Sequence, residues 1–104
     1  MPNFNIGTIN GFEPRQTDVD TASKTILAGS PTGGTTRVGI VLTNLSDGTI
    51  YLAFGAYAAV VGSGIPLLGS GGNWSMDEFS YTKESIQAIA HSNNAHLAIQ
   101  EFYV

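Results

Sequence analysis

The 104-residue sequence contains no cysteine. Its absence excludes disulfide cross-links, thiolate metal sites and cysteine nucleophiles, and it leaves the redox compartment open. Long apolar runs are also missing, because no run reaches the roughly 18 residues that a membrane-spanning helix needs. The opening stretch, MPNFNIGTING, lacks the basic and apolar regions of a secretory signal. We therefore expect a chain that neither spans nor binds a membrane.

Charge is scarce as well. Charged residues make up 12% of the chain, about half the usual share. Between residues 38 and 76 the only formal charge is that of Asp47. The net charge is −4, and the four cations are scattered: Arg15, Lys24, Arg37 and Lys83. This distribution excludes the basic footprint of a nucleic-acid-binding protein. It also means that the apolar middle of the chain is buried, either within its own fold or against a neighbour.

Helical stripes of ten or more residues are missing, and short alternating apolar runs take their place. Residues 37–55, RVGIVLTNLSDGTIYLAFG, contain two such runs around the turn sequence Ser46-Asp47-Gly48. Val38, Ile40 and Leu42 fall on one face of the first run, and Ile50, Leu52 and Phe54 on one face of the second. The pattern predicts a β-hairpin.

A second hairpin is predicted near the end of the sequence. Its strands are residues 85–91 and the closing run HLAIQEFYV, residues 96–104, with the loop SNNA between them. A helix over residues 83–91 is the alternative, because Ile86 and Ile89 lie three positions apart. Further strands are predicted at residues 24–28, 58–61 and 65–68 and around Trp74 and Met76.

Short strands at a spacing of about ten residues, separated by Gly-rich turns, indicate an all-β fold. We expect a small antiparallel β-sandwich or jelly-roll-like barrel of six to eight short strands, formed by residues 24–104. Residues 1–23 lack sustained periodicity and are predicted to form an extended N-terminal arm. Its isolated apolar residues suit docking on a neighbouring subunit, although a disordered tail or a first strand with loops also fits.

No pattern in the sequence predicts catalysis or cofactor binding. His91 and His96 flank a loop, but no third or fourth metal ligand accompanies them. Asp18 and Asp20 share one side of an extended segment and supply too few oxygens for Ca²⁺. The glycine-rich run from residue 62 to residue 72 lacks the Lys-Ser/Thr pair of a phosphate-binding loop. Asn44 and Asn73 each begin an N-x-S glycosylation pattern, which we attribute to chance. We expect no enzyme activity, no cofactor and no bound metal.

Residues 36–104 resemble a recurrent small β domain of tailed-bacteriophage virions. The similarity rests on three short motifs: LTNLSDGTIYL, GIPL and IQAI, whose matching positions include Asn44, Ser46, Tyr51 and Ile65. Glu101 stands where that pattern has its terminal acidic residue. The arm over residues 1–23 is not part of the pattern.

The resemblance implies a non-enzymatic virion structural protein, assembled in the host cytoplasm. Such a protein decorates or cements the capsid as a symmetric oligomer, often a trimer, and its partners are sister copies and the major capsid protein or another virion protein. The alternative is a tail or head-fibre module that binds host-surface glycans or another virion protein. Expected interface residues are Phe4, Ile6, Ile9, Phe12, Tyr51, Tyr57, Ile65, Leu67 and Trp74.

Overall fold

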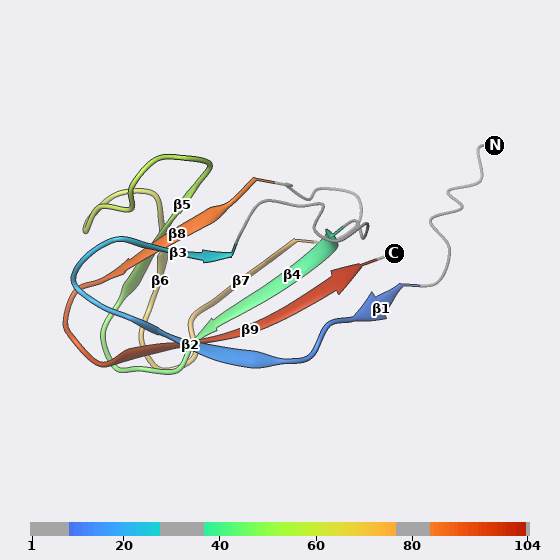
Figure 1. Ribbon diagram of the computed structural model, residues 1–104. Coiled ribbons are helices and arrows are strands. Elements are labelled where there is room, and N and C mark those ends of the chain that lie inside the picture. The colour runs from blue at the N-terminus through green and yellow to red at the C-terminus, as the bar shows by residue number, and fades with distance from the viewer. Residues whose placement is uncertain (1–8, 28–36, 77–83, 104) are drawn as a thin grey trace.

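The computed structural model describes residues 9–27, 37–76 and 84–103, which form two antiparallel β-sheets packed face to face (Figure 1). No helix occurs among these residues. The predicted all-β sandwich is therefore confirmed. The strands are β1 (Asn10–Gly11), β2 (Arg15–Val19), β3 (Lys24–Leu27), β4 (Arg37–Asn44), β5 (Ile50–Phe54), β6 (Ile65–Leu67), β7 (Asn73–Met76), β8 (Ile86–Ala90) and β9 (Ala95–Tyr103).

The strand order is that of a jelly roll. Sheet A has the order β2-β9-β4-β7, and β1 continues the β2 side of β9. Sheet B has the order β3-β8-β5-β6. From β2 to β9 each consecutive pair of strands is divided between the two sheets, except β5 and β6, which are neighbours in sheet B. This is the double-sheet arrangement of jelly rolls. Eight strands were the upper limit expected, and β1 adds a two-residue ninth.

The core lies between the sheets and follows the predicted alternation. Ile40 and Leu42 of β4 are fully buried, as are Ile50 and Leu52 of β5 on the facing sheet. Each such side chain contributes about 1.5–3 kcal/mol when it leaves water. On β8 and β9 the buried residues again occupy every second position. The pleat of each strand therefore places the faces as the sequence predicts.

Both predicted hairpins are wrong. β4 pairs with β7 and β9, whereas β5 pairs with β6 and β8, so the first two strands lie in opposite sheets. β8 and β9 are divided between the sheets in the same way. Their connections, residues 45–49 and 91–94, cross from one sheet to the other instead of folding a strand back onto its neighbour. A short polar turn between alternating runs is compatible with either outcome, because alternation identifies the buried face and not the partner strand.

Asn44 fixes the first of these crossings. Its Nδ2 donates to the carbonyl oxygens of Gly48 and Leu67, both at 2.8 Å. Its Oδ1 accepts from the backbone N of Ser46 at 2.9 Å and from the Ser46 hydroxyl at 2.6 Å. The side chain is fully buried and uses all its hydrogen-bonding capacity. The N-x-S pattern at Asn44 is therefore a buried structural motif, which excludes this amide as a surface glycosylation acceptor.

The short connections come together at one end of the sandwich, at the left of Figure 1. Leu45 N donates to His96 O, and Ser70 N donates to Ser46 O at 2.7 Å. Ala90 N, at the end of β8, donates to Asp20 O in the connection between β2 and β3. Backbone hydrogen bonds therefore close this end by joining the connections to one another and to the ends of β8 and β9.

Two further predictions differ from the structure. Residues 86–90 form strand β8, so the helical alternative over residues 83–91 is wrong. Residues 58–61 belong to the connection between β5 and β6 and form no strand. Glycines with positive φ interrupt this connection, at +91° for Gly62 and +82° for Gly64, and the chain turns there instead of extending.

The N-terminal segment differs from the predicted arm in its contacts. β1 and β2 are extended, but both pair with β9 of the same chain. Val19 is fully buried in the core. Residues 10–19 thus belong to the sandwich, and the predicted boundary at residue 23 falls in the β2–β3 connection. Residues 1–8 lie outside the described part of the chain.

Candidate interaction surface

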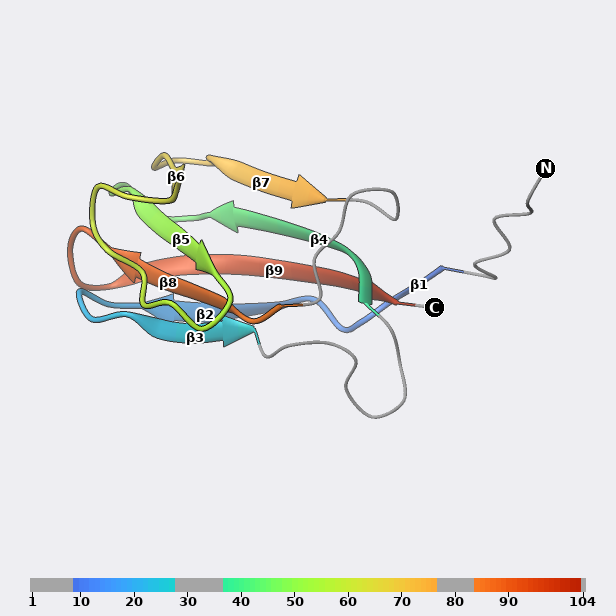
Figure 2. The ribbon, with the colours of Figure 1, turned by 90° about the horizontal axis from the view of Figure 1, so that it is seen from above.

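The connection over residues 55–64 lies across the outer face of sheet B, and Figure 2 looks down on it as it passes in front of β8. Gly55 N donates to Ser85 O at 2.7 Å, and Gln87 Nε2 donates to Gly55 O at 3.0 Å. Farther along, Ala59 N donates to Ser23 Oγ at 2.8 Å. These bonds tie the connection to β8 and to the residue before β3, so it is held against the sheet on both sides.

The same connection exposes apolar side chains. Ala59 is buried beneath it, whereas Tyr57 is 79% exposed, Val60 57% and Val61 42%. The sequence of residues 55–64, GAYAAVVGSG, carries no charge. Exposed apolar groups on a backbone already held in place lose little conformational entropy on binding. We call Tyr57, Val60 and Val61 the 55–64 surface, and it is the strongest candidate contact site among the described residues.

The expected interface residues of β5, β6 and β7 have different environments. Tyr51 is partly exposed on β5. Ile65 and Trp74 are half-buried and pack against the core. The Trp74 ring lies 4.9 Å from the ring of Phe54, centroid to centroid. Leu67 is only 1% exposed, so its place in the predicted interface is wrong: its side chain faces the interior and forms part of the core.

The expected N-terminal interface residues are also divided. Ile9 is 42% exposed. Phe12 is half-buried, with its ring 4.3 Å from that of Tyr103. Phe12 therefore anchors the N-terminal segment to its own chain. Phe4 and Ile6 lie outside the described residues.

Four exposed apolar residues in the connections between strands are absent from the expected interface set. The available signal is the uncharged, glycine-bounded run of residues 55–64, although the apolar residues within it predict a strand over residues 58–61. Leu45 and Leu68 follow buried strand ends in loops that cross between the sheets, where period-two alternation no longer predicts burial. The missed residues are Val60, Val61, Leu45 and Leu68.

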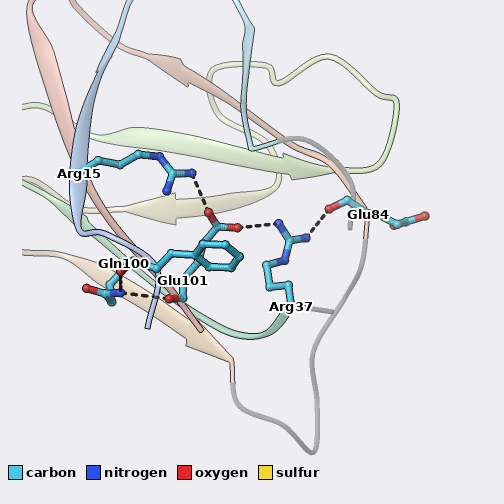
Figure 3. A network of polar contacts seen from close by, with 6 residues as sticks. Arg15, Arg37, Glu84, Gln100 and Glu101 are labelled. Carbon is cyan, nitrogen blue, oxygen red and sulfur yellow. Dashed lines mark hydrogen bonds and ion pairs between the residues drawn. The ribbon is translucent and has the colours of Figure 1, made fainter. Parts of the chain in front are cut away.

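A polar network holds the opposite end of the sandwich (Figure 3). Glu101 of β9 accepts from Arg15 of β2 at 2.7 Å through Oε1 and from Arg37 of β4 at 3.3 Å through Oε2. Arg37 also donates to the carbonyl oxygen of Glu84 at 2.8 Å. Arg37 and Glu101 are largely buried, whereas Arg15 is 43% exposed. One carboxylate thus joins three strands of sheet A, and Arg37 extends the network to the segment before β8.

Further contacts join the N-terminal segment to β9 in the same region. Phe12 N donates to Glu101 O at 2.9 Å, and Gln100 Nε2 donates to Phe12 O at 2.6 Å. Together with the ring contact to Tyr103, these bonds continue the β2–β9 ladder toward β1. The network therefore has a structural role: it fastens the first described residues to the last strand.

The two histidines lie at opposite ends of the connection between β8 and β9. His96 Nδ1 lies 2.8 Å from Asp18 Oδ1 on the neighbouring strand, and both groups are largely exposed. His91 begins the connection from sheet B to sheet A. Over residues 9–27, 37–76 and 84–103, no group of three or more His, Asp or Glu residues is placed to hold a metal ion. In the same residues no helix is long and apolar enough to span a membrane.

The comparisons with known proteins add no assignment. No protein-family model matches the sequence, and no curated protein matches it.

Proposed function

We propose that the chain is a non-enzymatic virion structural protein that covers or cements a capsid shell as a symmetric oligomer. The motif similarity of residues 36–104 to small phage virion domains motivates the proposal. The jelly roll is compatible with it, since this architecture is common in viral capsid domains. The same architecture also occurs in lectins, so the fold alone does not decide between them.

The 55–64 surface is the observation that carries the proposal. It presents three apolar side chains on a connection that is fixed to sheet B at Gly55 and Ala59. Residues 38–76 contain a single charge, so nothing in this connection opposes contact with another uncharged surface. A neighbour that covers these side chains would stabilise the assembly by about 1.5–3 kcal/mol for each one fully buried.

The proposal predicts that polar substitution of the 55–64 surface prevents attachment. The test variant is Tyr57→Ser combined with Val60→Thr and Val61→Thr. The partner is undecorated capsid shells of the virus that encodes the chain, and the measurement is co-sedimentation. The wild-type protein should pellet with the shells, and the triple variant should lose at least tenfold in affinity, since about 1.4 kcal/mol changes affinity by that factor.

Leu45→Ser provides the matched control, because Leu45 is exposed on a different connection. It should pellet like the wild type. A wild-type protein that stays in the supernatant at micromolar concentration would reject the proposed function. Equal binding by the triple variant and the wild type would exclude the 55–64 surface as the contact.

The glycan-binding alternative has less support. A sugar platform needs an exposed aromatic ring beside polar groups. The Trp74 ring is half-buried against Phe54, and Tyr57, the most exposed aromatic residue described, stands on an apolar connection. A virion structural protein therefore accounts for the positions of these rings better than a glycan-binding module does.

A further inference from the structure

The sandwich has open strand edges, and they differ in chemistry. An unpaired edge exposes backbone N–H and C=O groups, and proteins protect such edges with charge, proline or very short strands. β6 carries Pro66, β3 begins with Lys24, and β2 carries Arg15 and Asp18. β7 has the sequence Asn-Trp-Ser-Met, with neither charge nor proline. It is therefore the least protected edge among the described strands.

The register shows which backbone groups of β7 face outward. Asn44 N donates to Gly72 O, so these two residues form a hydrogen-bonded pair. Two positions along, Leu42 and Trp74 are opposite each other and form the next such pair. The N–H and C=O groups of Asn73 and Ser75 therefore point away from β4. Both residues are exposed, and no described strand lies beyond β7 in Figure 2.

We propose that β7 pairs with β7 of a second copy, antiparallel about a two-fold axis, so that sheet A continues from one chain into the next. The inference rests on the self-association proposed above and identifies the contact. Asn73 of each chain would lie opposite Ser75 of the other, and each pair would exchange both backbone hydrogen bonds. The contact is isologous, so it produces a dimer and not the trimer implied by the resemblance.

A second copy is the occupant because its own β7 is the best match on this chain. Pairing with β6 would lose a donor at Pro66. Pairing with β2 or β3 would place the charges of Asp18 or Lys24 beside an uncharged strand. The β7–β7 contact contains no charge on either side and needs no counter-ion.

Trp74 lies at the centre of this contact. In the proposed register Trp74 of one chain is opposite Trp74 of the other, at a non-hydrogen-bonded position where side chains approach closely. The half-buried indole would lose much of its remaining exposure to water. Trp74 is the single tryptophan of the chain, so its fluorescence reports on this contact directly.

Ser75→Lys tests the pairing, because it places a charge at the edge without changing a core residue. Gln16→Lys is the matched control, since Gln16 is exposed on β2 and its backbone likewise faces outward. Molar mass from light scattering, tryptophan emission and amide exchange by NMR are measured over a range of concentrations. The wild type and Gln16→Lys should form dimers as concentration rises, with a blue shift of Trp74 emission and at least tenfold slower exchange at Asn73 and Ser75. Ser75→Lys should remain monomeric and show neither change.

The outcomes separate this inference from the proposed function. If Ser75→Lys is monomeric but still pellets with shells, the β7 contact is supported and shell binding proceeds elsewhere. If Ser75→Lys dimerises like the wild type, or if Asn73 and Ser75 exchange rapidly within the dimer, the β7 contact is wrong. A monomeric wild type likewise overturns the β7 contact, and co-sedimentation then still tests attachment on its own.

Discussion

Asn44→Ala should lower the free energy of unfolding by about 3 kcal/mol, because buried polar groups that lose their partners cost about 1–3 kcal/mol each. The substitution removes both donors to the carbonyl oxygens of Gly48 and Leu67, and both acceptors for Ser46. Asn44 also lies where the chain crosses from sheet A to sheet B. The lost hydrogen bonds are therefore those that hold the crossing connection in place. For a domain with a typical stability of about 5–15 kcal/mol this is a large fraction.

Urea unfolding monitored by circular dichroism measures this effect. Asn73→Ala is the matched control: Asn73 is exposed, and its Nδ2 makes one long bond of 3.4 Å to Gly71 O. The control should change stability by less than about 0.5 kcal/mol. Equal small losses in the two variants would mean that the Asn44 amide does not stabilise the crossing.

Glu101→Gln should have the second-largest effect, a loss of about 2–3 kcal/mol, since hydrogen bonds to charged groups contribute about 1.5–3 kcal/mol. The substitution keeps the shape of the side chain and removes the charge that faces Arg37 and Arg15. Arg37 is 3% exposed, so water cannot replace the carboxylate as a neighbour of its guanidinium. The last strand would then be held less firmly to β4 and to the N-terminal segment.

Arg15→Gln provides the comparison within the same network. Arg15 is 43% exposed, and exposed ion pairs contribute about 0–1 kcal/mol. Thermal or urea unfolding should show a clearly lower free energy of unfolding for Glu101→Gln than for Arg15→Gln. If both variants lose the same amount, the network acts as an exposed ion pair and Arg37 does not depend on Glu101.

Most strands and their buried faces can be predicted from the sequence, but the pairing of one strand with another cannot. Alternation in β4, β5, β8 and β9 follows from the pleat, so Ile40 or Leu97 is identifiable as a core residue from its neighbours alone. Which sheet a strand joins depends on contacts far apart in the chain, such as the pairing of β4 with β9. The turn residues after Asn44 could not reveal this, because the amide that directs the crossing binds Leu67, twenty-three positions away.

The candidate surface was predictable only in part. Tyr57 is among the expected interface residues, and its side chain is 79% exposed. Leu67 is in the core instead of the expected interface. On a three-residue strand the two faces cannot be told apart without the register of β6 against β5. Val60 and Val61 are exposed because glycines turn the connection across sheet B, a feature that depends on tertiary hydrogen bonds at Gly55 and Ala59.

We propose that two copies of the chain associate through an uncharged surface of the jelly roll, the edge strand β7. Sedimentation equilibrium of the wild-type protein at micromolar concentration tests it most directly. The account predicts a concentration-dependent molar mass that rises to twice that of the 10.9 kDa chain. A molar mass that stays at the value of one chain throughout would contradict it.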